Sequence, residues 1–123
     1  APLHLTSVGK LFLAAEPPER VRAYATRTGL AGHTRNSLTQ VAALERELEG
    51  VRARGIAHDN EELEIGVRCI AAGVYDDAGK LVAGLSISAP ADRLELAWAD
   101  RVKATAQDIS RALGHEAPAK SGR

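Results

Sequence analysis

Two strand-like segments joined by a short polar turn constrain the fold of this chain more than any other feature. The segments "IGVRCIAAGVY" and "KLVAGLSIS" flank "DDAG", whose Asp and Gly residues are typical of tight turns. The pattern predicts an antiparallel β-hairpin. Its first arm carries Cys69, the only cysteine of the chain, and its second arm carries Ser86 and Ser88.

The length of the hairpin loop decides which side chains share a face, because side chains alternate along a strand. With a four-residue loop, Cys69 lies opposite Ser86 and Val67 lies opposite Ser88, so that all four line one face. This face offers a thiol, two hydroxyls and little bulk, which suits a small oxygenated ligand. The other face is then the expected core side and collects Ile70, Val74, Leu81, Ala83, Leu85 and Ile87.

Two other registers stay open on the sequence alone. A three-residue loop with Gly79 at a bulge places Cys69 among the apolar side chains instead. A bulge at Gly73 also resets the register. The face on which Cys69 lies therefore depends on where the two strands depart from regular pairing.

The remaining segments are predicted to form helices and one short strand. Apolar spacings of three and four residues predict helices over 7–15, 18–28, the stretch from Ser37–Thr39 to Gly55, and 93–114. Gly29 and Gly55 are expected to close the second and third helices. The segment "IAHD" predicts a strand. Thr6 or Ser7 is expected to cap the first helix, and Thr39 or Ser37 the third. Helices and an antiparallel hairpin in this order predict an α+β fold with helices packed on a sheet.

The composition excludes several classes of function. Sixteen basic and sixteen acidic residues cancel, so the chain has no overall attraction for nucleic acid or an anionic membrane. Its four aromatic residues are too few for a platform that stacks bases. The apolar runs are shorter than a membrane span, and a single cysteine suits a reducing compartment, so we expect a cytoplasmic location.

Catalysis by Cys69 is not the expected interpretation. A cysteine nucleophile needs an activating base, usually histidine, and none of the four histidines lies in a recognisable nucleophile motif. Arg68 adjoins Cys69 but points to the opposite face of a regular strand. A buried, inert cysteine is much commoner, and a pocket-lining thiol that does not react is the intermediate alternative.

The acidic turn after the short strand contains metal-ligand types without the spacing of a metal site. His58, Asp59, Glu61 and Glu62 lie close together, but they match no zinc or calcium signature. A charged turn before a strand is the simpler interpretation, so we predict no metal, no cofactor and no catalytic residue. His4 is expected at the surface or as a helix cap.

The start of the first helix is a candidate anion site. The unpaired amides around Thr6–Gly9 carry partial positive charge and would accept a carboxylate, and Gly9 would permit close backbone approach. Every helix has such an end, so the signal is weak by itself.

Four segments of the sequence resemble the effector-binding domain of the IclR family of bacterial transcriptional regulators. They are "HLTSVGKLFLA", "TRNSLTQVAALERELEGVRARG", "DNEELEIGVRCIAAGVYDDAGKLVAGLSIS" and "DISRALG". The third is the most specific, because an acidic turn, Gly-x-x-Cys-Ile-Ala, a hairpin and Ser-x-Ser follow in order. The resemblance covers about residues 4–114, and 115–123 form a polar tail.

The resemblance implies a GAF-like α+β domain that senses small organic acids. In a full regulator this domain follows a winged helix-turn-helix, and that domain, the linker helix and the first strand or strands of the sheet would precede Ala1. We therefore expect a homo-oligomer, dimer or tetramer, that contacts DNA only through the missing domain and does not contact membranes. Two alternatives are a thiol-dependent or hydrolytic enzyme using Cys69 and a purely structural dimerisation module.

The resemblance also implies a set of ligand contacts. A carboxylate would sit on the Ser7–Gly9 amides, the two serines would donate to it, and Asp59 would accept from a ligand hydroxyl or brace the serines. Ser7 and Val8 replace residues that are often Ala or Gly in the family, and Gly73 stands where Pro is common. Ligand occupancy would shift the arrangement of subunits. The residues carried over by motif are Ser7, Val8, Asp59, Val67, Cys69, Ser86 and Ser88.

Overall fold

The computed structural model describes residues 2–95 and 97–116, so the predicted tail lies outside it from residue 117 onward. The strands form an antiparallel sheet in the order β1-β2-β3, which confirms the predicted α+β fold. Across the described ranges, no helix has the length and apolar character needed to span a membrane. In chain order the elements are η1 (Leu3–Leu5), α1 (Ser7–Ala14), α2 (Pro18–Thr28), α3 (Val41–Arg54), β1 (Ile56–Asn60), β2 (Val67–Tyr75), β3 (Leu81–Pro90) and α4 (Trp98–Ala112).

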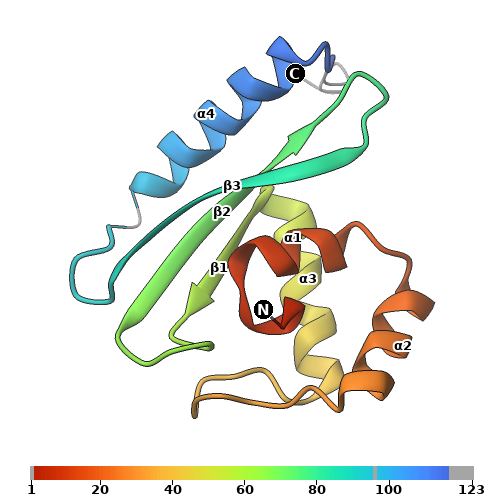
Figure 1. Cartoon of the computed structure of the whole chain (residues 1–123), viewed down its shortest axis with the longest axis vertical. Helices are drawn as coiled ribbons and strands as arrows, with labels where there is room; N and C mark the ends of the chain where they lie inside the picture. Colours follow the sequence, from red (N-terminus) through yellow and green to blue (C-terminus); the bar gives the residue numbers. More distant parts are fainter. Residues whose placement is uncertain (1, 96, 117–123) are drawn as a thin grey trace.

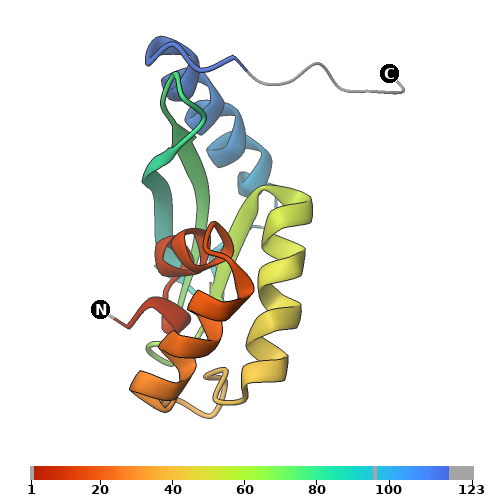
Figure 2. The same ribbon diagram turned by 90° about the vertical axis from the view of Figure 1, so that its right-hand side faces the viewer.

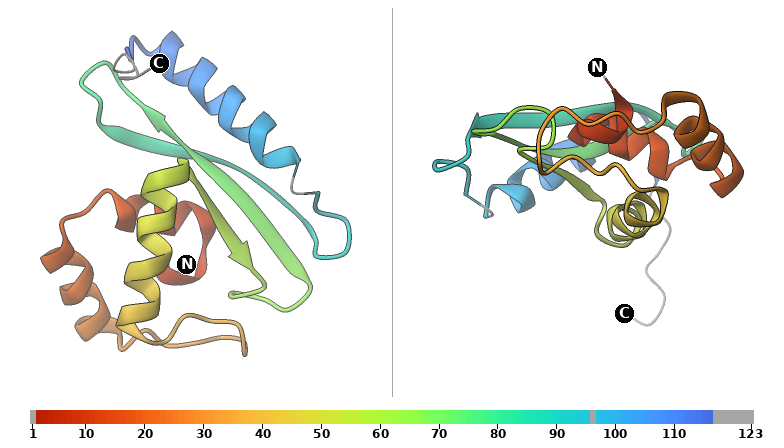
Figure 3. Two further views of the ribbon diagram at one scale, coloured as in Figure 1. Left: turned by 180° about the vertical axis from the view of Figure 1, so that it is seen from behind. Right: turned by 90° about the horizontal axis from the view of Figure 1, so that it is seen from below.

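Helices cover the sheet from both sides. α1 contacts all three strands and α3 contacts α1 and β1, whereas α4 lies against β2 and β3. In Figure 1, α4 runs alongside the β2–β3 hairpin, whereas α1, α2 and α3 lie on the β1 side of the molecule. Figure 2 shows α3 as the outermost helix on one side of the strands, and Figure 3 shows it in front of α1 in the view from behind.

The predicted hairpin forms, but its register differs from the prediction by two residues. Cys69 pairs with Ser88 rather than Ser86, and Val67 pairs with Pro90 rather than Ser88. Because the shift is an even number, Cys69 and both serines still share one face, as predicted.

Two irregularities in the hairpin cancel each other. The loop is the three-residue alternative: the Asp76 amide donates to the Lys80 carbonyl at 3.0 Å, and Gly79 adopts the required left-handed conformation with φ +78°. A bulge then follows between Val74/Tyr75 and β3, not at Gly73, and leaves Val82 without a partner. Each irregularity exchanges the faces once, so the expectation that the three-residue loop would bury Cys69 among the apolar residues is wrong.

The side chains on each face of the sheet belong to a different core cluster. Ala71 of β2 packs in the larger cluster with α1, α2 and α3, and so does Leu81, which the bulge turns away from its predicted face. Ala72 and Val74 pack instead with Val102 of α4. The prediction of a single core face is therefore wrong, because helices bury the centre of both.

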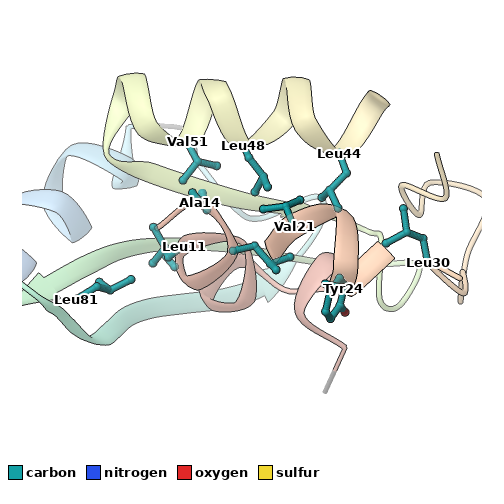
Figure 4. Close-up of a cluster of buried hydrophobic side chains, with 12 residues drawn as sticks. Leu11, Ala14, Val21, Tyr24, Leu30, Leu44, Leu48, Val51 and Leu81 are labelled. Atoms are coloured by element: carbon teal, nitrogen blue, oxygen red, sulfur yellow. The ribbon is translucent and has the colours of Figure 1, made fainter. Parts of the chain in front are cut away.

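The larger cluster fixes α3 and α2 against α1. Figure 4 shows Leu44, Leu48 and Val51 pointing from α3 toward Val21 and Ala14. Leu44 and Leu48 have no exposed surface. α2 and α3 both end at the glycines predicted to close them, each of which adopts a left-handed conformation.

The predicted caps of α3 are wrong. The residue before the helix is Gln40, and it makes no side-chain cap. The Ser37 hydroxyl instead donates to the Glu62 carbonyl at 2.6 Å, which ties the connector before α3 to the acidic turn after β1. Thr39 is exposed and makes no cap either.

The last helix is shorter than predicted. It begins at Trp98 rather than near Arg93. The amides of Arg93 and Leu94 both donate to the Pro90 carbonyl, at 2.8 and 3.2 Å, and so form a turn at the end of β3. Residues 90–94 therefore belong to this turn and not to α4.

A side chain at position 84 should separate α1 from β3. A Cβ atom built on Gly84 would lie 3.0 Å from a methyl carbon of Val8 and 3.3 Å from Leu11. We expect Gly84→Val to lower the free energy of unfolding by about 1–3 kcal/mol, measured by urea denaturation, because overpacking forces neighbours to move. Ala83→Val, at the exposed neighbouring position, is the control. Equal stabilities of the two variants would contradict this close packing.

Candidate functional site

Cys69 of β2 and the two serines of β3 lie on one face of the sheet. Cys69 Sγ and Ser88 Oγ lie 3.0 Å apart and share a hydrogen bond. Ser86 pairs with Ala71, two residues along each strand from the Cys69–Ser88 pair, and so lies on the same face of the sheet. Both serines are exposed, whereas Cys69 and Val67 are half-buried. A bound molecule could therefore reach both hydroxyls and the thiol.

The start of α1 adjoins this surface. Val8 is half-buried and packs on Gly84, two residues before Ser86 on the same strand, and Ser7 is buried. Thr6 caps the helix as predicted: its Oγ1 accepts a hydrogen bond from the Gly9 amide at 3.0 Å. The capped Gly9 amide is already in use, so the prediction that it serves a ligand is wrong.

Gly9 has a packing role instead. A Cβ atom at this position would collide with the Leu3 carbonyl oxygen and with Thr6 Oγ1. The close backbone approach predicted for a ligand is therefore made by the turn η1. The amides of Ser7 and Val8 remain as the donors at the start of α1, since the first amides of a helix have no partner within it.

Asp59 lies on the same face of the sheet but points into the structure. It pairs with Cys69 across β1 and β2, and it is only 3% exposed. Its Oδ1 accepts a hydrogen bond from the Glu62 amide at 2.8 Å. Among the bonds found for the described residues, Asp59 therefore braces the acidic turn and not the serines.

Lys10 is the principal residue at the site that the sequence analysis missed. It has no exposed surface, and its ammonium donates to Glu47 Oε2, Glu62 Oε2 and the His58 carbonyl at 2.9, 2.8 and 2.6 Å. These bonds join α1 to α3, β1 and the acidic turn. The signal was present in "SVGKLFLA", where Lys10 is the single charged residue of an apolar helix.

Removing the Lys10 ammonium should destabilise the fold strongly. We expect Lys10→Met to lower the free energy of unfolding by about 3–5 kcal/mol, because it leaves the buried Glu62 carboxylate and the partly exposed Glu47 carboxylate without their partner. The exposed Lys80→Met is the control and should change it by less than about 0.5 kcal/mol. Thermal or urea unfolding of the two variants measures the difference; similar values would exclude this role of Lys10.

Among the described residues, neither His58 nor His4 is placed to activate Cys69. His58 pairs with Ile70, so its side chain leaves the sheet on the face opposite Cys69, as does that of Arg68. His4 is buried, which contradicts its predicted surface position: its ring bonds to the Tyr24 hydroxyl and the Ala31 carbonyl, each at 2.9 Å. Within the described ranges, no group of three or more His, Cys, Asp or Glu side chains could hold a metal ion.

His58 makes the stability of this region depend on pH. Burial lowers the pKa of His58 below its ordinary value of 6.5, and the nearby Arg54, Lys10 and Arg68 charges lower the pKa further, against an opposing effect of Glu47. Neutral His58 is therefore favoured in the folded protein, so its contribution to stability is present above pH 6.5 and is lost as the pH falls through the lowered pKa.

Replacing His58 should reduce this loss of stability in acid. We expect the free energy of unfolding of His58→Gln to fall less than that of the wild type between about pH 7 and pH 5. Urea denaturation at several pH values measures the two slopes, with the exposed His33→Gln as control. A slope for His58→Gln equal to that of the wild type would contradict the assignment.

The sequence matches one protein family over nearly its whole length. The family described as bacterial transcriptional regulator IclR C-terminal matches residues 1–114. The chain belongs to this family. It is the effector-binding domain of an IclR-family transcriptional regulator and not an enzyme, which confirms the predicted family and sets aside the thiol-enzyme alternative.

Relatives within the IclR family are longer than this chain. The transcriptional repressor AllR of Salmonella paratyphi A is 40% identical over 121 residues, which cover 95% of this chain and 44% of AllR. The chain thus spans less than half the length of that relative. The crystal structure of Thermotoga maritima IclR has a TM-score of 0.81 and 38% identity, over 92% of this chain and 47% of that protein.

A third relative is solved with a small acid. The inducer-binding domain of a PobR double mutant from Acinetobacter, in complex with 3-hydroxybenzoic acid, has a TM-score of 0.84 and 26% identity. The match covers 94% of this chain and 66% of that one. The likeness extends over nearly the whole of this effector-binding domain.

Proposed function

We propose that this domain binds a small carboxylic acid, a keto acid or an aromatic acid, on the surface between α1 and the Cys69 strand. The observation that carries the proposal is the convergence of three kinds of group on one face of the sheet. These are the amides of Ser7 and Val8 at the start of α1, the hydroxyls of Ser86 and Ser88, and the thiol of Cys69.

Each group has a distinct role in the proposal. The two amides carry the partial positive charge of a helix start and receive the carboxylate, and the serine hydroxyls donate to its oxygens. Val8, Val67 and Cys69 supply the apolar wall. Asp59, held by the Glu62 amide, keeps the acidic turn in position and would accept from a ligand hydroxyl only through its remaining lone pairs.

The complex of PobR with 3-hydroxybenzoic acid supports the class of ligand. That protein and this chain share the fold over nearly all of this domain. A hydroxybenzoate carries an anionic end, an apolar ring and a hydroxyl, which match in kind the donors, the wall and the acceptor named above.

We propose further that acid binding changes the arrangement of subunits in a full regulator. In this proposal the complete protein is a homodimer or homotetramer whose preceding winged helix-turn-helix domain contacts DNA, and the acid favours one spacing of those domains over another. Residues 4–114 form the sensing unit of that protein and 115–123 its tail. Sedimentation of the full regulator with and without the acid distinguishes this role from a purely structural dimerisation module.

Isothermal titration tests the proposed contacts. We expect a panel of keto acids and hydroxybenzoates to contain at least one ligand whose affinity falls about tenfold in Ser88→Ala, as loss of one charge-assisted hydrogen bond predicts. Thr105→Ala, which removes an exposed hydroxyl on α4, should bind like the wild type. Equal affinities of Ser88→Ala and the wild type for every binding acid would remove the serine from the site.

A further inference from the structure

A cavity lies at the acidic turn and is distinct from the surface proposed for acids. Its volume is about 340 Å³, and it opens between the connector before α3, Glu47 of α3 and the turn that follows β1. Neither serine of β3 and none of the residues at the start of α1 lines it. Its lining residues are Asn36, Leu38, Glu47, Asn60, Glu61, Glu62 and Arg68.

Two residues of this cavity carry buried polar atoms that have no hydrogen-bond partner among the described residues. Oε1 of Glu62 accepts no hydrogen bond, although Glu62 is only 3% exposed. Nε of Arg68 likewise donates none. A buried carboxylate oxygen that accepts no hydrogen bond lowers the stability of the folded protein. A ligand that donates an N–H group to Glu62 Oε1 would remove this cost and would be bound here.

The charges around the cavity show which donor fits. The single Lys10 ammonium is shared between two carboxylates, Glu47 and Glu62. Arg68 lies 4.0 Å from Glu61 and offsets that carboxylate. With buried Asp59 beside them, the acidic groups exceed the basic ones by two formal charges, and the cavity therefore favours a cation over an anion.

We propose that this cavity binds the ammonium group of a small primary amine. The ammonium donates to Oε1 of Glu62 and lies near Glu47, and Leu38 contacts the carbon chain behind it. The inference goes beyond the proposed acid site, since it concerns other residues and a ligand of opposite charge. Because the Glu62 amide bonds to Asp59, the two sites meet at the acidic turn.

Residue-resolved NMR with n-butylammonium as the probe tests the proposal. We expect saturable shifts of the amides of Asn36, Glu62 and Arg68, and none for equal concentrations of n-butanol or butyrate. Glu62→Gln keeps the size of the side chain and removes its charge, so the affinity should fall at least tenfold. Glu64→Gln, an exposed change in the same turn, should leave the affinity unchanged.

Other outcomes separate this proposal from the acid site. Shifts that do not saturate, that spread over all acidic surfaces, or that persist in Glu62→Gln would overturn the amine site. If Glu62→Gln does not fold, Glu47→Gln, at a partly exposed residue, should weaken binding at least threefold. The acid site would show itself by shifts of Ser7, Cys69 and Ser88 with hydroxybenzoates, so either site can fail without the other.

Discussion

The architecture of the candidate site depends on one buried ammonium group. Lys10 lies on α1 and bonds to α3, to the β1 backbone and to the acidic turn, all without contact with solvent. A lysine loses its hydration in such a place and is stable only when each of its donors finds an acceptor. The elements that supply these acceptors cannot move far from α1 without leaving the charge unpaired.

The same group therefore relates the two parts of the proposed acid site. Ser7 is three residues before Lys10 on α1, and Asp59 is held by Glu62, which Lys10 binds. An acid bound between the helix start and the sheet would sit in a frame whose geometry Lys10 fixes. Preorganisation of this kind reduces the ordering that a ligand must otherwise impose.

Much of the fold could be predicted from local sequence signals, because turns and caps act over a few residues. Thr6, Gly29 and Gly55 mark the helix ends that they were predicted to mark. The hairpin register could not be predicted in this way. The loop at Gly79 has a local signal in the sequence, but the bulge at Val82 has none, and the register depends on both. The shared face of Cys69, Ser86 and Ser88 was predicted correctly because the two irregularities cancel.

Contacts between distant segments account for what the sequence analysis missed in the site. Lys10, Glu47 and Glu62 lie far apart in the sequence. Nothing in the sequence next to each one distinguishes it from an ordinary charged residue at the surface. Even the isolated lysine of an apolar helix does not reveal its partners. The acidic turn likewise had the pattern of a solvated loop, although Glu62 is buried and its carbonyl accepts the Ser37 hydroxyl.

A double-mutant cycle between Lys10 and Glu62 tests most directly whether this pair holds α1 to the acidic turn. The free energies of unfolding of the wild type, Lys10→Met, Glu62→Met and the double variant give the coupling between the two side chains. The structure predicts a favourable coupling of about 2 kcal/mol or more, as for other desolvated charge pairs in contact. A coupling near zero, with the two single effects simply adding, would contradict the account.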